Sequence, residues 1–227
     1  MNITCRAAIR VVAPILLLVV WASTAAAQID TYKAVERYNR VSKGANVEEW
    51  HKRLFDPDPN KRLEAVDSLA KDGSEECVKP LLDATADPDP RVRAKAIDAL
   101  GEIGSPKATQ VLSQYLVLNN TDRASKQRVL VALGRIGDPA AVDPIISYLH
   151  KTNDPELRCA ALYALGEIGD GRAIEPVQAL ASSPDANVKR LASEALVKIK
   201  AKVAALPNAQ PTILELERRL GPQQKPR

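Results

Sequence analysis

The sequence has few of the side chains that usually carry chemistry. Its 227 residues include two histidines, three cysteines and one methionine, and aromatic residues make up 4% of the chain. His51 and His150 are each followed by lysine, and neither stands at a spacing that would bring a second metal ligand beside it. The sequence therefore predicts no metal site and no other cofactor.

The chain also lacks a strong charge of one sign. Lysine and arginine total 32 residues against 28 acidic ones, which gives a formal net charge of +4. Nucleic-acid binding calls for a basic stripe with aromatic side chains for stacking, and neither is present. No glycine-rich phosphate loop and no nucleophile elbow occurs. We expect a protein that binds no nucleic acid and is not an enzyme.

What the sequence does contain is a repeat. Leucines recur at intervals of 31, 33, 32 and 31 residues, and self-similarity at such a period is typical of a solenoid. The 45% of hydrophobic residues, with few aromatics, favours helices packed through alanine and leucine. The leucines of this column are Leu69, Leu100, Leu133, Leu165 and Leu196.

Each leucine follows an aspartate by eleven residues, and a basic residue stands four positions after that aspartate. Aspartate is a strong N-cap, because its carboxylate accepts hydrogen bonds from the free N–H groups of the first helical turn. We call these positions the aspartate column and the basic column. Their members are Asp58 and Arg62, Asp89 and Arg93, Asp122 and Lys126, Asp154 and Arg158, and Asp185 and Lys189.

Each repeat reads as two helices. After the aspartate, apolar residues recur at helical spacing, as at Val92, Ala96 and Leu100, and a shorter apolar run follows a turn. One such unit has too narrow an apolar face to be stable alone, so neighbouring units must stack. Glycines at two positions of three repeats predict the helix ends: Gly101, Gly104, Gly134, Gly137, Gly166 and Gly169.

The runs DPDPRVRAKAIDALGEIG (87–104) and DPELRCAALYALGEIGDGRAIEPVQAL (154–180) resemble HEAT-like repeats of the type named after phycobilisome lyases. The run RASKQRVLVALGRIGDPAAVDPIISYL (123–149) carries the same resemblance, which covers roughly residues 47–200. It implies an all-α fold, a right-handed α-α superhelix of about five helical hairpins with terminal capping helices. It also implies that the aspartate and basic columns form a ladder linking successive repeats.

A functional alternative is that the basic column binds an anionic ligand. An acid within one helical turn of every base favours internal pairing instead. The family name comes from bilin lyase activity, but no residue of this sequence can be assigned a catalytic role in that reaction.

Residues 1–27 read as a signal peptide. Arg6 and Arg10 precede an apolar run from Val11 to Ala22, and small residues follow at Ala25 to Ala27. We expect cleavage before Gln28 and export to the bacterial periplasm or beyond. The alternative is an uncleaved anchor of residues 9–27 in the inner membrane, although the apolar run is shorter than the ~20 residues that span a bilayer. Membrane contact is expected only through this segment.

The other segments follow from composition. Residues 28–45 are predicted to form an N-terminal capping helix, with an aromatic docking site of Tyr32, Tyr38 and Trp50 as the alternative. Residues 46–200 form the repeat array and residues 201–210 a linker. Residues 211–227 carry a C-terminal helix, which either caps the array or binds a partner, and a tail.

Two cysteines, Cys77 and Cys159, lie outside the signal segment and nearly three repeats apart. Packed helices lie ~8–10 Å apart, so three layers put these residues ~25 Å from each other. A disulfide needs Cα atoms within about 7 Å. We therefore predict two free thiols in or near the core.

Binding surface is the remaining route to a function. In HEAT arrays the helix with the aspartate and the base typically lines the concave face, so its outward positions can meet a partner. These positions are basic in the third repeat, and apolar groups break the pattern of charge; exposed apolar groups beside arginine are typical of interface centres. The predicted binding patch for a protein or peptide consists of Arg128, Val131, Arg135 and Tyr163.

The sequence thus favours a non-catalytic interaction scaffold. Two alternatives remain: a lyase-like or chaperone-lyase enzyme of the phycobilisome-lyase type, and a structural envelope protein that self-associates through uncapped ends. A reactive acid or thiol in the groove would have to come from Cys159 or Glu167.

Overall fold

The computed structural model describes residues 46–118 and 121–205. Residues 46–53 are helical, and the described residues from Trp50 onward belong to one unit. The predicted signal peptide, the N-terminal cap and the C-terminal helix lie outside the described residues. Within them the chain is helical and carries no strand, which confirms the all-α solenoid.

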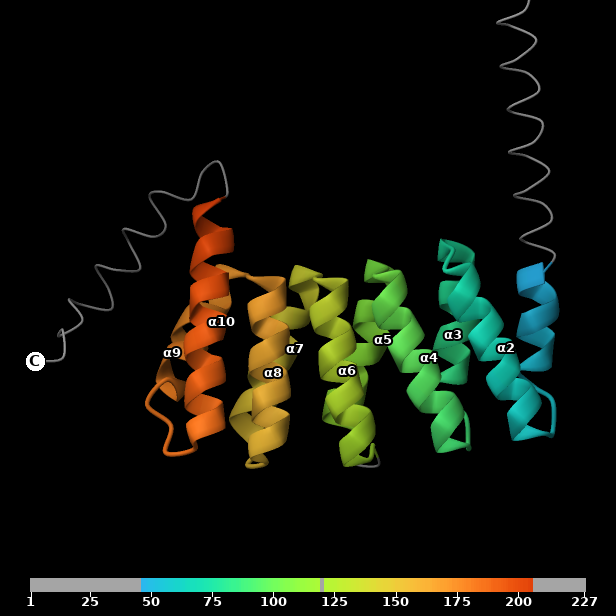
Figure 1. Ribbon diagram of the computed structural model, residues 1–227, viewed down its shortest axis with the longest axis horizontal. Coiled ribbons are helices and arrows are strands. Elements are labelled where there is room, and N and C mark those ends of the chain that lie inside the picture. The colour runs from blue at the N-terminus through green and yellow to red at the C-terminus, as the bar shows by residue number, and fades with distance from the viewer. Residues whose placement is uncertain (1–45, 119–120, 206–227) are drawn as a thin grey trace, which may run out of the picture. The chain divides into compact units, whose positions relative to one another are not determined.

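Two kinds of helix alternate along this unit and lie in two layers (Figure 1). The longer ones lie side by side and are α2 (Pro59–Asp72), α4 (Pro90–Ile103), α6 (Arg123–Ile136), α8 (Pro155–Ile168) and α10 (Ala186–Ala204). The shorter ones lie behind them and are α3 (Val78–Ala84), α5 (Thr109–Val117), α7 (Val142–Lys151) and α9 (Ile174–Leu180). We call the two outer surfaces the long-helix face and the short-helix face.

The aspartate column begins every long helix, as its N-cap chemistry predicts. Asp185 accepts hydrogen bonds from the backbone N–H groups of Asn187 at 2.9 Å and Val188 at 3.0 Å. Asp58, Asp89, Asp122 and Asp154 cap their helices in the same way. Local sequence therefore fixes where each long helix starts.

The leucine column forms the core between the layers. Leu69, Leu100, Leu133 and Leu165 are fully buried, whereas Leu196 in α10 is half-buried. The first four leucines belong to long helices that another hairpin follows. The described array ends at α10, so the last leucine is covered from one side only.

The glycines divide into two groups that the sequence did not separate. Gly104, Gly137 and Gly169 have positive φ and end α4, α6 and α8, as predicted. The helix end predicted at Gly101, Gly134 and Gly166 is wrong, because these glycines lie inside their helices.

The internal glycines instead let the long helices approach one another. A Cβ on Gly101 or Gly134 would lie 2.9 Å from the Cα of Ala132 or Ala164 in the next long helix. Backbone atoms cannot swing aside, so only glycine fits this contact. The equivalent residue of α10 is Val197, which is 70% exposed.

The boundary of the array also differs from the expectation. The linker was predicted to begin at residue 201, but α10 continues to Ala204 because Ile199 and Val203 remain on its buried side. Among the described helices, none is both long enough and apolar enough to cross a membrane.

Candidate functional site

The basic column holds the loop in front of its own helix. The Arg62 guanidinium donates through Nη1 to the carbonyl oxygens of Asp56 at 2.9 Å and Pro57 at 3.2 Å. Arg93 donates in the same way to the carbonyls of Asp87 and Pro88. Arginine suits this role because its planar fork can satisfy several acceptors at once.

Two arginines of this column also reach the next repeat. Arg62 forms a bidentate ion pair with Asp87, with Nε at 2.7 Å and Nη2 at 2.9 Å from the two carboxylate oxygens. Both side chains are buried. Arg93 Nη2 lies 3.7 Å from the Asp122 carboxylate. The inter-repeat link is therefore present, although the partner of Arg62 stands two positions before the aspartate column.

The rest of the predicted ladder is arranged differently. No aspartate of the column forms an ion pair with the base four residues later in the described part of the chain, because its carboxylate is turned to the N–H groups it caps. Arg158 donates to the Thr152 carbonyl at 3.0 Å, and Lys126 lies over the Tyr148 ring at 5.7 Å from its centroid. For Lys189 the structure shows no side-chain partner among the described residues.

A different arginine joins the third and fourth repeats. Arg123, at the start of α6, binds the carboxylates of Asp154 and Glu156 at the start of α8. The Arg123 hydrogen bonds and the N–H groups that Asp154 caps hold the pKa of Asp154 at about 2, below its ordinary value of 3.8.

Three residues of the predicted binding patch come together on the long-helix face. Arg128, Val131 and Arg135 line a cleft of about 450 Å³ between α4 and α6. Asp98 and Glu102 of α4 line the same cleft. Arg128 forms an ion pair with Asp98, and Arg135 lies 4.0 Å from Glu102. The sequence predicts a basic surface at these positions of the third repeat, but α4 supplies the balancing acids.

The fourth residue of the patch lies outside this cleft. Tyr163 belongs to α8, is 37% exposed, and has Lys198 Nζ over its ring at 5.7 Å from the centroid. Lys198 also forms an ion pair with Glu167, which raises the pKa of Lys198. Tyr163 therefore stands beside its own pair of opposite charges.

Ion pairs between neighbouring long helices follow a register that the sequence analysis missed. Nine residues after the N-cap stand Asp67 and Asp98, and their partners Lys95 and Arg128 stand six residues after the next N-cap. Each such pair is a rung of what we call the charge ladder.

The same nine-residue positions in the next two repeats are Val131 and Tyr163, so the charge ladder gives way to apolar residues halfway along the face. A second column, thirteen residues after each N-cap, alternates in sign along the array. Its members are Lys71, Glu102, Arg135, Glu167 and Lys198. Both columns are visible in the sequence when the repeats are aligned by their N-cap aspartates.

Chemical groups suited to catalysis or metal binding do not converge in the described residues. No cluster of three or more histidine, cysteine or carboxylate side chains is found there that could hold a metal ion. Cys77 and Cys159 are free thiols, buried and half-buried respectively, as predicted. Burial raises the pKa of both thiols, which disfavours the reactive thiolate.

Comparison with known families agrees with this architecture. The family model for HEAT repeats matches residues 47–125, 115–197 and 144–211. The chain belongs to the HEAT-repeat family. The resemblance seen in the sequence is thereby confirmed.

Solved structures show the same fold. The complex of CpcE and CpcF of phycocyanin lyase from Nostoc sp. PCC7120 is similar with a TM-score of 0.57 and 24% identity, over 77% of this chain and 69% of that one. A designed armadillo repeat protein in complex with the peptide (KR)4 is similar with a TM-score of 0.50 and 18% identity, over 72% and 86% of the chains. At these identities the likeness concerns the fold alone. No curated protein gave a significant match.

Proposed function

We propose that this HEAT-repeat protein is a non-catalytic scaffold that docks a protein or peptide on its long-helix face, centred on Val131 and Tyr163. The observation that carries the proposal is the break in the charge ladder. Rungs of opposite charge join α2 to α4 and α4 to α6, and the equivalent positions of α6 and α8 are apolar.

The break has the composition of an interface centre. Interfaces favour aromatic and apolar groups at the middle and polar groups at the rim. Tyr163 is exposed and Val131 is half-buried, while Arg128 on one side and Lys198 on the other are charged and already paired. Paired rim charges can rearrange toward a partner without the desolvation cost of an isolated buried charge.

The family likeness is compatible with this role. One similar structure is a complex of two subunits and the other a complex with a peptide, so the fold is able to carry such partners. The proposal also includes export, which the signal-like residues 1–27 support. Export would place the partner outside the cytoplasm.

A lyase-like activity has weaker support. The two residues that could act in the groove are Cys159, whose pKa is raised by burial, and Glu167, which is engaged by Lys198. Neither is the free, activated group that nucleophilic or acid–base chemistry requires.

Site-specific crosslinking tests the proposal. A photoreactive phenylalanine analogue replaces Val131 in the chain of residues 28–227, and the matched control carries it at Lys79, an exposed position of α3 on the other face. Incubated with envelope extract, the Val131 variant should yield a crosslinked partner that the Lys79 variant does not. Adding Tyr163→Ala should weaken that product. Equal products from both positions, or none from position 131, would overturn the proposal.

A further inference from the structure

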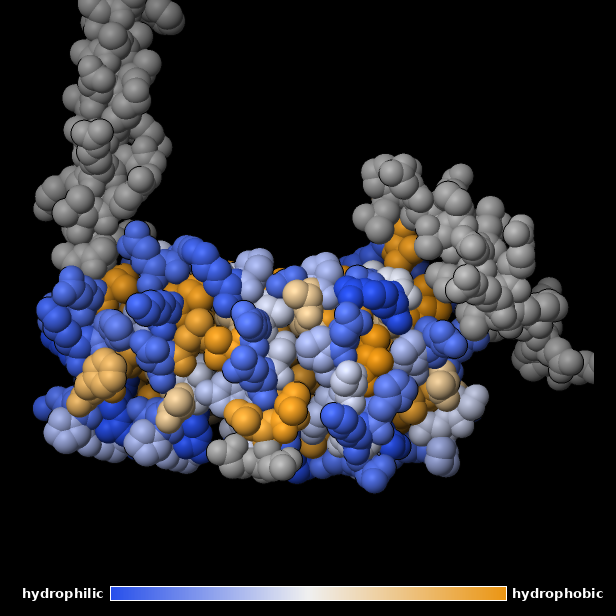
Figure 2. Space-filling model, turned by 180° about the vertical axis from the view of Figure 1, so that it is seen from behind, coloured by the Kyte–Doolittle hydropathy of each residue, from blue (hydrophilic) through white to orange (hydrophobic). Residues whose placement is uncertain are grey.

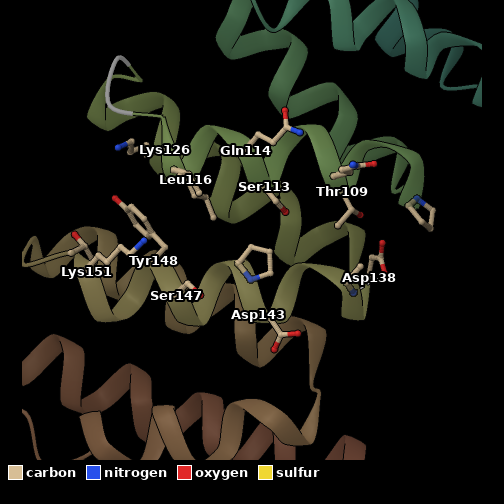
Figure 3. A pocket seen from close by; sticks show the side chains of 16 residues that line it. Thr109, Ser113, Gln114, Leu116, Lys126, Asp138, Asp143, Ser147, Tyr148 and Lys151 are labelled. Atoms are coloured by element: carbon tan, nitrogen blue, oxygen red, sulfur yellow. Dashed lines mark hydrogen bonds between the residues drawn. The ribbon is translucent and has the colours of Figure 1, made fainter.

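A second surface lies on the short-helix face and is independent of the scaffold proposal. Seen from behind, this face is hydrophilic but interrupted by apolar patches (Figure 2). A groove of about 1090 Å³ opens here between α5 and α7 (Figure 3). Leu116, Val117, Pro144 and Tyr148 supply its apolar lining.

The groove follows from the way the two layers pack. Glycine lets α4, α6 and α8 approach closely, whereas α5 and α7 contain no glycine and both line the groove. Val117, in the last turn of α5, is 69% exposed. The facing sides of the short helices are thus left partly uncovered.

Two hydroxyl groups in the groove are buried without a partner. Thr109 and Ser113 of α5 are 3% and 8% exposed, and neither Oγ1 of Thr109 nor Oγ of Ser113 has a hydrogen bond to any of the described residues. Both side chains line the groove (Figure 3). Burying a hydroxyl without a partner costs free energy, so these groups indicate a ligand that would satisfy them.

The ends of the groove differ in charge. Lys126 and Lys151 lie at one end beside Tyr148, and Asp138 and Asp143 lie at the other (Figure 3). Asp143 is bound by Arg172 at 2.6 Å, and Asp138 caps the turn at Pro139–Ala141. Neither lysine has an ion pair within the described residues. Asp138 also has no ion pair there, so the unpaired positive charge is confined to the lysine end, which calls for an anion.

The length and polarity of the groove define the rest of the ligand. Asp143 and Lys151 are eight residues apart on α7, which spans ~12 Å at 1.5 Å per residue. An extended peptide of about four residues covers that distance. Gln110, Gln114 and Ser147 add polar groups along the walls. Peptide N–H and C=O groups can satisfy them, whereas a hydrocarbon chain would leave them unpaired.

We propose that the groove between α5 and α7 binds the C-terminal end of a partner polypeptide. The terminal carboxylate lies between Lys126 and Lys151, apolar side chains cover Val117 and Tyr148, and the peptide backbone reaches Thr109 and Ser113. Capture of a terminal carboxylate by convergent donors is a known mode of peptide recognition. A nucleic acid fits less well, because its phosphates would meet Asp138 and Asp143.

Matched peptide pools test the ligand class. Both pools carry fluorescein, a Gly-Gly spacer and four mixed positions of Ala, Val, Leu, Ser and Gln; one ends in a free carboxylate and the other in an amide. Fluorescence anisotropy with residues 28–227 should show binding of the acid pool at least about tenfold tighter than the amide pool, since charge-assisted hydrogen bonds are lost with the amide.

The lysines and the buried hydroxyl give the decisive controls. Lys126→Gln with Lys151→Gln should abolish the preference for the acid pool, and Lys79→Gln, outside the groove, should keep it. Ser113→Ala should raise the Tm of the free protein and weaken binding of the acid pool. Equal binding of the two pools, absence of binding, or a preference that survives loss of both lysines would overturn the proposal. Val131 and Tyr163 are unchanged in these variants, so the outcome of this test is independent of the scaffold proposal.

Discussion

A single methyl group limits how closely the long helices can pack. Gly101 and Gly134 stand where a Cβ would press on the backbone of the next long helix. Helix propensity alone favours alanine over glycine by ~1 kcal/mol at an interior position. The contact between repeats works against that preference, and the observed glycines show which effect dominates.

Gly134→Ala should therefore destabilise the protein. Overpacking costs ~1–3 kcal/mol and exceeds the ~1 kcal/mol gained in propensity, so urea unfolding should show a net loss of up to ~2 kcal/mol. Gly171→Ala is the matched control, since its Cβ would meet only Val203 Cγ2 at an ordinary 3.6 Å. A Gly134→Ala variant as stable as the Gly171→Ala variant would show that α6 and α8 can separate freely.

The buried pair of Arg62 and Asp87 makes a second residue-scale prediction. Arg62→Met leaves a buried carboxylate without its cation, so Tm should fall by several degrees. Adding Asp87→Asn should restore part of that loss, because the amide oxygen still accepts from the Asp89 N–H but carries no charge. Thermal melts followed by circular dichroism measure both effects. A double variant less stable than Arg62→Met would show that the isolated carboxylate is not the cause.

At the scale of the helix, the start of α8 is stabilised by a pair whose strength depends on pH. The Arg123 guanidinium depresses the pKa of Asp154 to about 2. The folded value is below the ordinary 3.8, so the pair stabilises the fold above pH ~4 and this contribution is lost as pH falls toward ~2.

Arg123→Gln should consequently lower Tm at pH 7 but make little difference near pH 2. Thermal melts of both proteins from pH 7 to pH 2 should show their Tm values converging between pH ~4 and ~2. Lys79→Gln serves as the control, with a Tm difference from the parent that does not follow this profile. If the Tm difference between Arg123→Gln and the parent stays constant down to pH 2, ionisation of Asp154 is not the cause of that difference.

Elements were predictable where the cause is local. The aspartate caps and the leucine column depend on residues within one helix, and both are found where the sequence places them. The sequence alone does not reveal the role of Gly134, because a glycine near a helix end and a glycine at a close helix crossing have the same sequence pattern. The predicted linker overlaps the end of α10, because Val203 continues the apolar stripe of the helix into that segment.

The candidate site was harder to predict because it depends on distances between repeats. Arg128 and Asp98 are thirty residues apart in the chain and adjacent only once α4 packs on α6. The sequence therefore overstated the positive charge of the patch. The groove beside Ser113 has no sequence motif, because its lining comes from α5 and α7, which belong to different repeats.

At the scale of the array, each hairpin contacts its neighbours and the described stack stops at α10. Val197 occupies the position at which α4, α6 and α8 carry the close-contact glycine, and it is exposed. A further long helix could not approach α10 as closely as α8 approaches α6. The residue that replaces glycine thus lies in the last long helix of the described stack.

This arrangement predicts that one substitution has unequal effects along the leucine column. Leu133→Ala, in a fully buried central position, should cost ~2–5 kcal/mol in urea unfolding. Leu196→Ala, at a half-buried position of α10, should cost less than half as much, because within the described array its neighbours lie on one side only. The side-chain change is identical, so the difference between the two unfolding free-energy costs measures the contribution of packing against neighbouring repeats. Equal costs at the two positions would mean that stability is shared evenly over the array, contrary to nearest-neighbour packing.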